Sequence, residues 1–354
     1  MGEFDLIERY FKRPERAEAR ANGVTLGIGD DCALLQPRPN TLLAISSDVL
    51  VEGRHFFANV DPAALGHKAL AVNLSDLAAC GAKPIAFTLA LALPAVNEPW
   101  LAAFSNGLFA LADAHNCELV GGDTTRGPLN ICITVFGEVP LINGQSQALL
   151  RSGAKVGDDI YVSGSLGEAR LALEVLRGNL TVSEDVFASI RQRLERPTPR
   201  IALGLALLGI ATASIDVSDG LLGDLGHILK RSNVGACVET ESLFTMQVVA
   251  NYLFNTRARD HSDFKRAQNP DLSLQSTLIG YVLAGGDDYE LAFTAAPAAR
   301  AQVQTAARQS QTSVTRIGQI ESATGLRLVD TSGALVQSQW RSFDHFALRR
   351  GSGG

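Results

Sequence analysis

The chain has 354 residues, of which 46 % are hydrophobic and 19 % charged, and its formal net charge is −6. This composition is typical of a soluble globular protein, and the length suits two domains. The negative charge argues against a general nucleic-acid binder and against adhesion to an anionic membrane. A negative protein that handles anionic phosphates needs cations as counter-charges, and metal ions are the natural ones.

The cysteines and the N-terminus indicate a cytoplasmic protein. The five cysteines are scattered, without CxxC spacing, and most lie in apolar runs, so we expect reduced, mostly buried thiols. The first residues include the acidic Glu3, Asp5 and Glu8 and lack a long apolar core, which argues against a signal peptide. No stretch approaches the roughly 20 apolar residues of a membrane span.

Predicted strands and helices alternate through the first 150 residues. Asp61 followed by Pro62, and Asn97 followed by Glu98 and Pro99, are helix starts, because each supplies an N-cap and a proline for the first turn. Strands are expected over 42–45, 85–93, 117–120 and 131–139, and helices over 3–11, 61–81 and 97–115. This alternation predicts an α/β or α+β N-terminal domain over residues 1–150.

A polar, glycine-rich stretch at 150–157 predicts the domain boundary, and a C-terminal α/β domain follows over 151–346. Strands are expected over 159–162, 213–216, 236–239, 291–294, 314–319 and 326–329, and helices over 166–177, 184–195, 199–209, 221–230 and 296–309. Residues 252–276 are polar and poorly periodic, which indicates a surface loop or insertion. Residues 347–354 are expected to be a flexible tail.

Carboxylates beside glycine, serine or threonine recur at the predicted ends of these elements. In the stretch 213–230, Asp216 ends a strand and Asp219 opens the next helix. Two like charges so close repel each other unless a cation lies between them. Carboxylates in similar settings recur upstream at Asp30, Asp31, Asp48, Asp76 and Asp123. Asn73 and Asp76 also lie on one face of their predicted helix, so both can contact the same ligand.

Such hard oxygen donors favour Mg²⁺ or Ca²⁺ over zinc. Mg²⁺ takes only one or two carboxylates per ion and completes its shell with water and phosphate oxygens, so seven acids predict several ions on one polyphosphate site. The alternative for each acid alone is an ordinary helix or turn cap.

For five further residues the sequence leaves two interpretations open. Arg126, Arg151 and Lys68 either neutralise phosphate oxygens or lie solvated on the surface. His55 is either structural or directed at the cleft near Asp48, and Trp340 either stacks on a ligand or packs.

Eight segments together are similar to one family, in that family's order and over nearly the whole chain to residue 346. They are GIGDDCA (27–33), ISSD (45–48), KALAVNLSDLAACGA (68–82), GGDTTRG (121–127), RSGAKVGD (151–158), SIDVSDGLLGDLGHI (214–228), GGDDYEL (285–291) and WRSFDHF (340–346). The chain thereby resembles the bacterial thiamine-monophosphate kinase family, of the aminoimidazole ribonucleotide synthetase superfamily. The resemblance implies an N-terminal sheet that pairs across a homodimer, a C-terminal α/β domain folded over it, and ATP in the cleft between the domains.

The resemblance also implies an activity and a set of site residues. The reaction is the ATP-dependent phosphorylation of thiamine monophosphate to thiamine diphosphate, the last step of its biosynthesis, by direct in-line transfer with several Mg²⁺ ions. By matching position, Mg²⁺ is assigned to Asp30, Asp31, Ser46, Ser47, Asp48, Asp76, Asp123, Asp216 and Asp219, with the choice between Asp30 and Asp31 open. ATP is assigned to Gly121, Gly122, Asp123, Arg151 and Ser218, and thiamine phosphate to His55, Asp287 and Trp340. Catalysis is assigned to Asp48, Asp123, Arg151 and Asp216.

Two departures and two rivals qualify this reading. The family often has glutamate where this chain has Asp287, so a contact there is one methylene shorter, and the insertion at 252–276 is longer than usual.

One rival is another ATP-dependent synthetase of the same superfamily. Selenophosphate synthetases carry a reactive cysteine or selenocysteine near the N-terminus, and none precedes Cys32. The other rival is a non-catalytic Mg²⁺ or nucleotide sensor.

Overall fold

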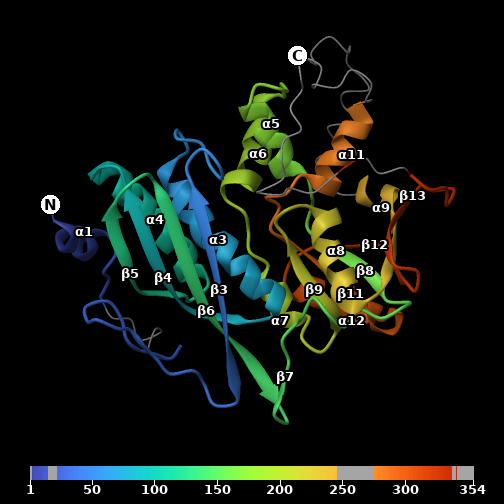
Figure 1. The fold of residues 1–354 in the computed structure, drawn as a ribbon, viewed down its shortest axis with the longest axis horizontal. Coiled ribbons are helices and arrows are strands. Elements are labelled where there is room, and N and C mark those ends of the chain that lie inside the picture. Colours follow the sequence, from blue (N-terminus) through green and yellow to red (C-terminus); the bar gives the residue numbers. More distant parts are fainter. Residues whose placement is uncertain (1, 15–21, 245–273, 337–339, 341–354) are drawn as a thin grey trace.

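The computed structural model describes residues 2–14, 22–244, 274–336 and 340, and its strands form two large sheets side by side (Figure 1). The first sheet has the strand order β3-β6-β4-β5, with β7 beside β6. Its half contains α1 (Glu3–Tyr10), β1 (Val24–Leu26), β2 (Leu34–Leu35), β3 (Thr41–Val51), α3 (Pro62–Cys80), β4 (Lys83–Leu93), α4 (Glu98–Ala114), β5 (Glu118–Arg126), β6 (Asn130–Ile142) and β7 (Gln145–Ser146).

The second sheet has the strand order β13-β10-β12-β8-β11-β9, in which only β10 and β13 are parallel neighbours. Its half contains β8 (Asp159–Ser163), α5 (Glu168–Leu176), α6 (Glu184–Glu195), α7 (Ile201–Ala206), β9 (Ala211–Val217), α8 (Leu221–Ser232), β10 (Gly235–Glu239), α9 (Thr240–Phe244), α11 (Leu274–Ala284), β11 (Glu290–Ala295), η2 (Pro297–Ala299), α12 (Arg300–Gln309), β12 (Val314–Glu321) and β13 (Gly325–Val329). Among the helices described, none has the length and hydropathy needed to cross a bilayer.

The predicted helix starts are confirmed by their capping bonds. The Asp61 carboxylate accepts the Ala64 N–H at 2.7 Å, and the Asn97 side chain accepts the Trp100 N–H at 3.1 Å. Helix α3 ends at Gly81, whose φ of 67° is the left-handed conformation that favours glycine. The elements predicted for the second half form close to their ranges, although α7 ends at Ala206 instead of residue 209. Helices α9 and α11 were not predicted.

Two predicted strand ends were wrong. Strand β3 continues to Val51 because it pairs with β6 along its whole length, so 46–48 lie within the strand and not beyond it. Strand β5 continues to Arg126 because it pairs with β4, so 121–123 also lie within a strand. In both cases the pairing partner, which a local pattern does not reveal, extends the strand through polar residues.

Other expectations are corrected or lie outside the described residues. All five cysteines are free, but only Cys117 is buried and Cys32 is exposed, so most of the thiols are not buried. Of the predicted insertion, 274–276 begin helix α11 and 252–273 lie outside the described residues, as does the tail from 347. The domain division at 150/151 falls between β7 and β8 and stays a prediction.

Helix α3 lies between the two sheets and packs against elements of both (Figure 1). Leu70 and Leu74 on this helix belong to a core that also contains Leu203, Leu207 and Phe293 of the second half. The helix α7 backbone approaches α3 so closely that a Cβ on Gly204 would lie 2.0 Å from the Ala78 carbonyl oxygen. The two halves therefore share a core through α3.

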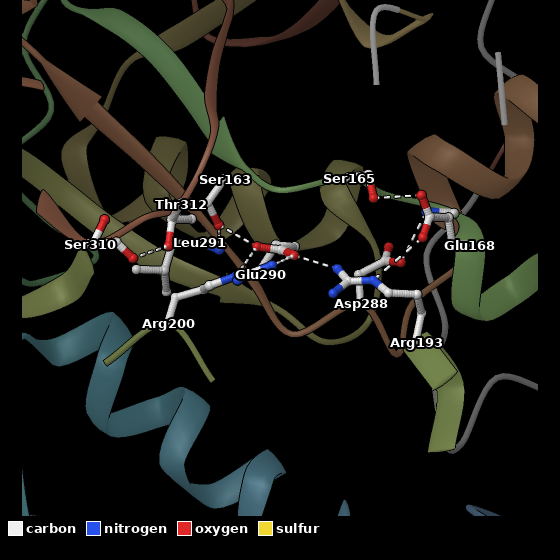
Figure 2. Close-up of polar contacts among 11 residues, drawn as sticks. Ser163, Ser165, Glu168, Arg193, Arg200, Asp288, Glu290, Leu291, Ser310 and Thr312 are labelled. Atoms are coloured by element: carbon white, nitrogen blue, oxygen red, sulfur yellow. Dashed lines mark hydrogen bonds and ion pairs between the residues drawn. The ribbon is translucent and has the colours of Figure 1, made fainter. Parts of the chain in front are cut away.

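A buried carboxylate joins β11 to the helices that precede β9 (Figure 2). Glu290 is fully buried and forms ion pairs with Arg193 of α6 and with Arg200, whose Nε lies 2.6 Å from Oε2. The Ser163 hydroxyl of β8 donates to the same carboxylate at 2.6 Å. Arg193 also lies 3.4 Å from Glu168 of α5, so this network holds α5, α6 and the start of α7 on the sheet.

We expect Glu290→Gln to lower the free energy of unfolding by about 3–5 kcal/mol, because it leaves Arg200 without its buried counter-charge and Arg193 with Glu168 alone. The control is Glu195→Gln, which removes a partly exposed partner of Arg191 on the same helix α6 and should cost less than about 1 kcal/mol. Urea denaturation of both variants tests this expectation. Equal decreases in the free energy of unfolding would show that the buried Glu290 network stabilises the fold no more than the partly exposed pair does.

Candidate active site between the two sheets

Helix α3 presents polar side chains to both halves of the molecule. Asn73 and Ser75 are almost completely buried, which is costly unless their polar atoms are paired. The Asn73 carbonyl accepts the Asp48 N–H of β3 at 3.0 Å, and the Ser75 hydroxyl donates to Asp216 of β9 at 2.9 Å. Asp76, the next residue, accepts a hydrogen bond from the Ser46 hydroxyl. One helix therefore brings a strand of each sheet to the same place.

Four carboxylates from both halves repel one another at this junction. Burial, and then repulsion by Asp76, raises the pKa of Asp48 to about 6, and Asp219 contributes. Burial also raises the pKa of Asp216 well above its usual value, with repulsion by Asp76 as the next cause. The pKa of Asp76 is raised by burial, although the Ser46 hydroxyl and the Arg151 guanidinium lower it. A cation placed here would relieve this repulsion.

The turn that carries Ser218 and Asp219 is held by a carboxylate from the following helix. Asp224 of α8 accepts the backbone N–H groups of Ser218, Asp219 and Gly220 at 3.1, 3.1 and 3.0 Å. Burial raises the pKa of Asp224 to about 7, while these N–H groups act in the opposite direction. Asp224 thus sets the direction in which the Asp219 carboxylate leaves the turn.

The segment before β11 lies against the same turn. Asp287 and Tyr289 adopt left-handed φ angles of 62° and 52°, which are unusual for residues with side chains. Their N–H groups donate to the carbonyls of Ser218 and Val217, each at 2.8 Å. The Asp287 carboxylate lies 2.9 Å from the Lys68 Nζ and accepts the Tyr289 hydroxyl at 3.2 Å. This contact corrects the surface alternative for Lys68, which is buried.

Two cavities adjoin the junction. One, of about 580 Å³, is lined by Asp76, Arg151, Asp216 and Arg231. The other, of about 100 Å³, lies between the halves and is lined by charged and apolar side chains, among them His55, Phe56, Lys68, Leu173, Leu194 and Asp287. The His55 ring is fixed there, since its Nδ1 accepts the Val51 N–H at 2.9 Å.

The remaining predicted acids form a second group. Asp30, Asp31 and Asp123 line a different pocket of about 690 Å³, together with Gly121 and Gly122. The strand register aligns Asp123 with Ala90, Cys132 and Val49, on the sheet face turned away from α3. The Ser47 hydroxyl lies on this face too, 3.0 Å from Thr134, whereas Ser46 and Asp48 face α3. The structure therefore divides the predicted metal ligands between two faces of one sheet.

Two other predicted contacts lie away from the junction. Trp340 packs against the core of the second half, next to Gly280 of α11, which agrees with the packing alternative. Arg126 at the end of β5 is exposed. Neither residue lines the two cavities at the junction.

Comparisons with known proteins decide the family. Residues 29–139 match the family model described as AIR synthase related protein, N-terminal domain. The thiamine-monophosphate kinase of Salmonella typhimurium is 45 % identical over 348 residues, which cover 98 % of each chain. The chain belongs to the thiamine-monophosphate kinase family. The resemblance inferred from the eight sequence segments is thereby confirmed.

Solved structures share the fold of this family member. The crystal structure of thiamine-monophosphate kinase from Stenotrophomonas maltophilia K279a is 43 % identical, with a TM-score of 0.76 over 93 % of this chain and 96 % of that one. A structure described as AaThiL complexed with AMPPCP and TMP is 30 % identical, with a TM-score of 0.70 over 98 % and 97 % of the two chains. The expected α/β fold of the superfamily is confirmed.

The donor set of this thiamine-monophosphate kinase family member fits Mg²⁺. Within the residues described, no group of three or more His, Cys, Asp or Glu side chains is arranged to hold a metal by itself. Mg²⁺ usually takes only one or two carboxylates and completes its octahedron with phosphate oxygens and water, so an incomplete protein set suits it. The mutual repulsion among Asp48, Asp76, Asp216 and Asp219 is the observation that favours a cation here.

Three contributors to the site were missed in the sequence. Ser75 and Asp224 lie inside the segments 68–82 and 214–228 quoted above, but serine and aspartate in helices read as ordinary polar residues. Tyr289 follows two acids and shows its role only through the fold of its turn. Polar residues inside otherwise apolar helices were the available signal for the first two.

We expect Asp224→Asn to weaken Mg²⁺ binding by about tenfold or more, because an outer carboxylate that orients a metal ligand is lost. The control is Asp158→Asn, since Asp158 is a buried carboxylate that also accepts an N–H, from Lys155 at 2.9 Å, outside the junction. Calorimetric titration with Mg²⁺ in the presence of a non-hydrolysable ATP analogue compares the two. Unchanged Mg²⁺ affinity in Asp224→Asn would remove its orienting role.

Proposed function

We propose that this chain phosphorylates thiamine monophosphate to thiamine diphosphate with ATP as co-substrate, and that it uses several Mg²⁺ ions. The observation that carries the proposal is the group of four carboxylates from both halves, of which Asp76 and Asp216 line the larger cavity. Asp287, which lines the smaller cavity, is bonded through its N–H to Ser218 beside this group. Two cavities near one group of carboxylates that favours a bound cation suit a reaction between two substrates that both carry phosphate. The family supplies the identity of the acceptor.

The residues suit a phosphate acceptor. The attacking group is a phosphate oxygen that is already ionised at pH 7, so no strong general base is needed. Phosphoryl transfer then depends on holding donor and acceptor in line and on neutralising charge. Mg²⁺ bound to the phosphates would supply that neutralisation. This agrees with a site rich in aspartate. The one cysteine among the described residues that line the larger cavity, Cys80, is disfavoured as a thiolate nucleophile, because burial raises its pKa.

We assign the metal ligands as the resemblance does. Asp48, Asp76, Asp216 and Asp219 would hold Mg²⁺ at the junction, and Ser46 adds a hydroxyl that is bonded to Asp76. The second group, on the other side of the sheet, would hold further Mg²⁺ through Ser47, Asp123 and either Asp30 or Asp31.

The substrate contacts are assigned as the resemblance implies, and three of them, Arg151, His55 and Asp287, line the two cavities. Arg151 lowers the pKa of Asp76 by its charge and lines the larger cavity, where its planar guanidinium can bind phosphate oxygens of ATP. Ser218, Gly121 and Gly122 are the other proposed ATP contacts. Gly122 has a structural reason as well, because a Cβ there would lie 1.8 Å from the Leu89 carbonyl oxygen. Thiamine phosphate is assigned to the smaller cavity because two of its proposed contacts, His55 and Asp287, line it. Trp340, the third contact that the resemblance implies, packs outside this cavity.

We expect Asp48→Asn, Asp123→Asn and Asp216→Asn to lower turnover by orders of magnitude, because each loses a charged phosphate-side metal ligand. Without Mg²⁺, Asp216→Asn should be at least as stable as the parent, since a buried, repelled charge is removed while an acceptor for Ser75 remains. Steady-state kinetics and thermal unfolding measure the two effects. Near-normal turnover in all three variants would sink the assignment.

One assay separates the kinase from its rivals. We expect ADP release from Mg²⁺ and ATP only when thiamine monophosphate is added, and none with thiamine or without an acceptor. Equal release with thiamine would indicate another kinase class. ATP binding without ADP release in any arm would indicate a sensor.

We further propose a homodimer in the cytoplasm, formed through the first sheet. Strand β3 is an edge strand of that sheet, and the face turned away from α3 exposes Leu43, Ile45 and Val49, of which Ile45 is 60 % exposed. Helices α3 and α4 cover the opposite face (Figure 1). A long edge strand with an exposed apolar face is unfavourable in water and is stabilised by a second sheet.

We expect the wild-type protein to elute with twice its chain mass of 37.6 kDa, and Ile45→Lys to shift it to the monomer, because a charge would be buried at the sheet face. The control is Val156→Lys, which places the same charge at an equally exposed valine of the second half. Light scattering after gel filtration measures the mass. A dimeric Ile45→Lys would place the interface elsewhere.

A further inference from the structure

The ion pair between Lys68 and Asp287 joins the two halves inside the small cavity. Lys68 projects from α3, is only 4 % exposed, and its Nζ lies 2.9 Å from the Asp287 carboxylate. Burying an ammonium group is costly unless its donors are satisfied. An ammonium has three donors, and this carboxylate is the one hydrogen-bond acceptor found for Lys68 among the described residues. The lysine therefore keeps donor capacity on the cavity side.

The cavity around this pair is too small for a ligand as it stands. Its volume of about 100 Å³ is below the roughly 300–1,000 Å³ of typical ligand pockets. Its walls come from the first half, at His55, Phe56 and Lys68, and from the second half, at Leu173 and Asp287. Because its walls come from both halves, the cavity enlarges when the halves separate, and separation breaks the Lys68–Asp287 pair. A ligand must then satisfy both charges.

The charges and walls match one class of ligand. Lys68 and Asp287 form an ion pair in the lining, together with aromatic and leucine side chains. Arg54, Arg177 and Glu195 also line the cavity, but both arginines are exposed, whereas Lys68 is buried. A zwitterion with a cationic heterocycle and a phosphate monoester fits this lining. Its cation pairs with the Asp287 carboxylate, its phosphate pairs with Lys68, and its ring contacts the apolar walls. Thiamine monophosphate, the proposed acceptor, has this chemistry, whereas thiamine lacks the anion.

The pair also lies beside the proposed centre of transfer. Asp287 is bonded through its N–H to the Ser218 carbonyl at 2.8 Å, and Ser218 lies between Asp216 and Asp219 in sequence. A phosphate that replaced the Asp287 carboxylate at Lys68 would therefore lie next to the carboxylates assigned to Mg²⁺.

We propose that substrate binding exchanges the partners of this ion pair: Lys68 binds the phosphate of the acceptor, and Asp287 binds its cationic heterocycle. In the free protein, the Asp287 carboxylate takes the place of the ligand's phosphate at Lys68. The Lys68 ammonium takes the place of the ligand's cationic ring at Asp287. Lys68 is in consequence the residue that distinguishes the monophosphate from the unphosphorylated alcohol. This inference rests on the proposed function, because it takes the acceptor from it.

The test compares Lys68→Met with Asp287→Asn, which break the same ion pair but leave opposite partners in place. Calorimetry gives the dissociation constants of thiamine monophosphate and of thiamine for each protein. In Lys68→Met, the affinity for the monophosphate should fall by about tenfold or more while that for thiamine does not fall, because a charge-assisted contact to phosphate is lost. In Asp287→Asn, the preference for the monophosphate should persist, and thiamine should bind less tightly.

The outcomes are distinguishable. A parallel loss for both ligands in Lys68→Met would show that the lysine is only a strut between the halves, and would overturn the proposal. If Lys68→Met does not fold, as judged by thermal unfolding, Asp287→Asn decides: loss of the preference for the monophosphate there also overturns it. Failure of the wild-type protein to release ADP with thiamine monophosphate would instead contradict the proposed function.

Discussion

The hydrogen bond from Ser75 to Asp216 is the contact on which the geometry of the site depends. It joins α3, which is fixed to the first sheet, to β9 of the second sheet, and both side chains are almost completely buried. A buried hydroxyl that donates to a buried carboxylate permits little displacement, because either group left alone would carry the full desolvation cost. The positions of Asp76 and Asp219 relative to each other follow from this single register between helix and strand.

This fixed register produces a site that is electrostatically unfavourable in the free protein. The apolar core that holds α3 against β9 also removes water from Asp48 and Asp216, and their charges then repel those of Asp76 and Asp219. Packing of the shared core holds the acids together despite their repulsion. A bound cation would lower this repulsion and so stabilise the folded protein. The same relation between stability and function is common where a site must bind charged ligands.

Much of the fold and part of the site could be predicted from the sequence. Caps such as Asp61 and Asn97 act through neighbours within one turn, so a local pattern predicted the helices that they begin, α3 and α4. The middle of β3 could not be placed in this way, because its pairing with β6 comes from residues about 80–90 positions further along. That pairing also decides that Ser47 and Asp48 face opposite sides of the sheet. Composition identified the acids, but only the register divides them into two groups.

The contacts of Glu290 help to fix the conformation of the strained turn that contains Asp287 and Tyr289. Asp287 and Tyr289 hold left-handed backbone angles that cost energy, and such angles persist only where the surroundings determine them. On one side, the N–H bonds to Val217 and Ser218 fix the turn to β9. On the other side, Glu290 begins β11 and is anchored by two arginines and a serine (Figure 2). The turn is therefore clamped at both ends, and the Asp287 side chain between them is left to respond to whatever charge Lys68 or a ligand presents.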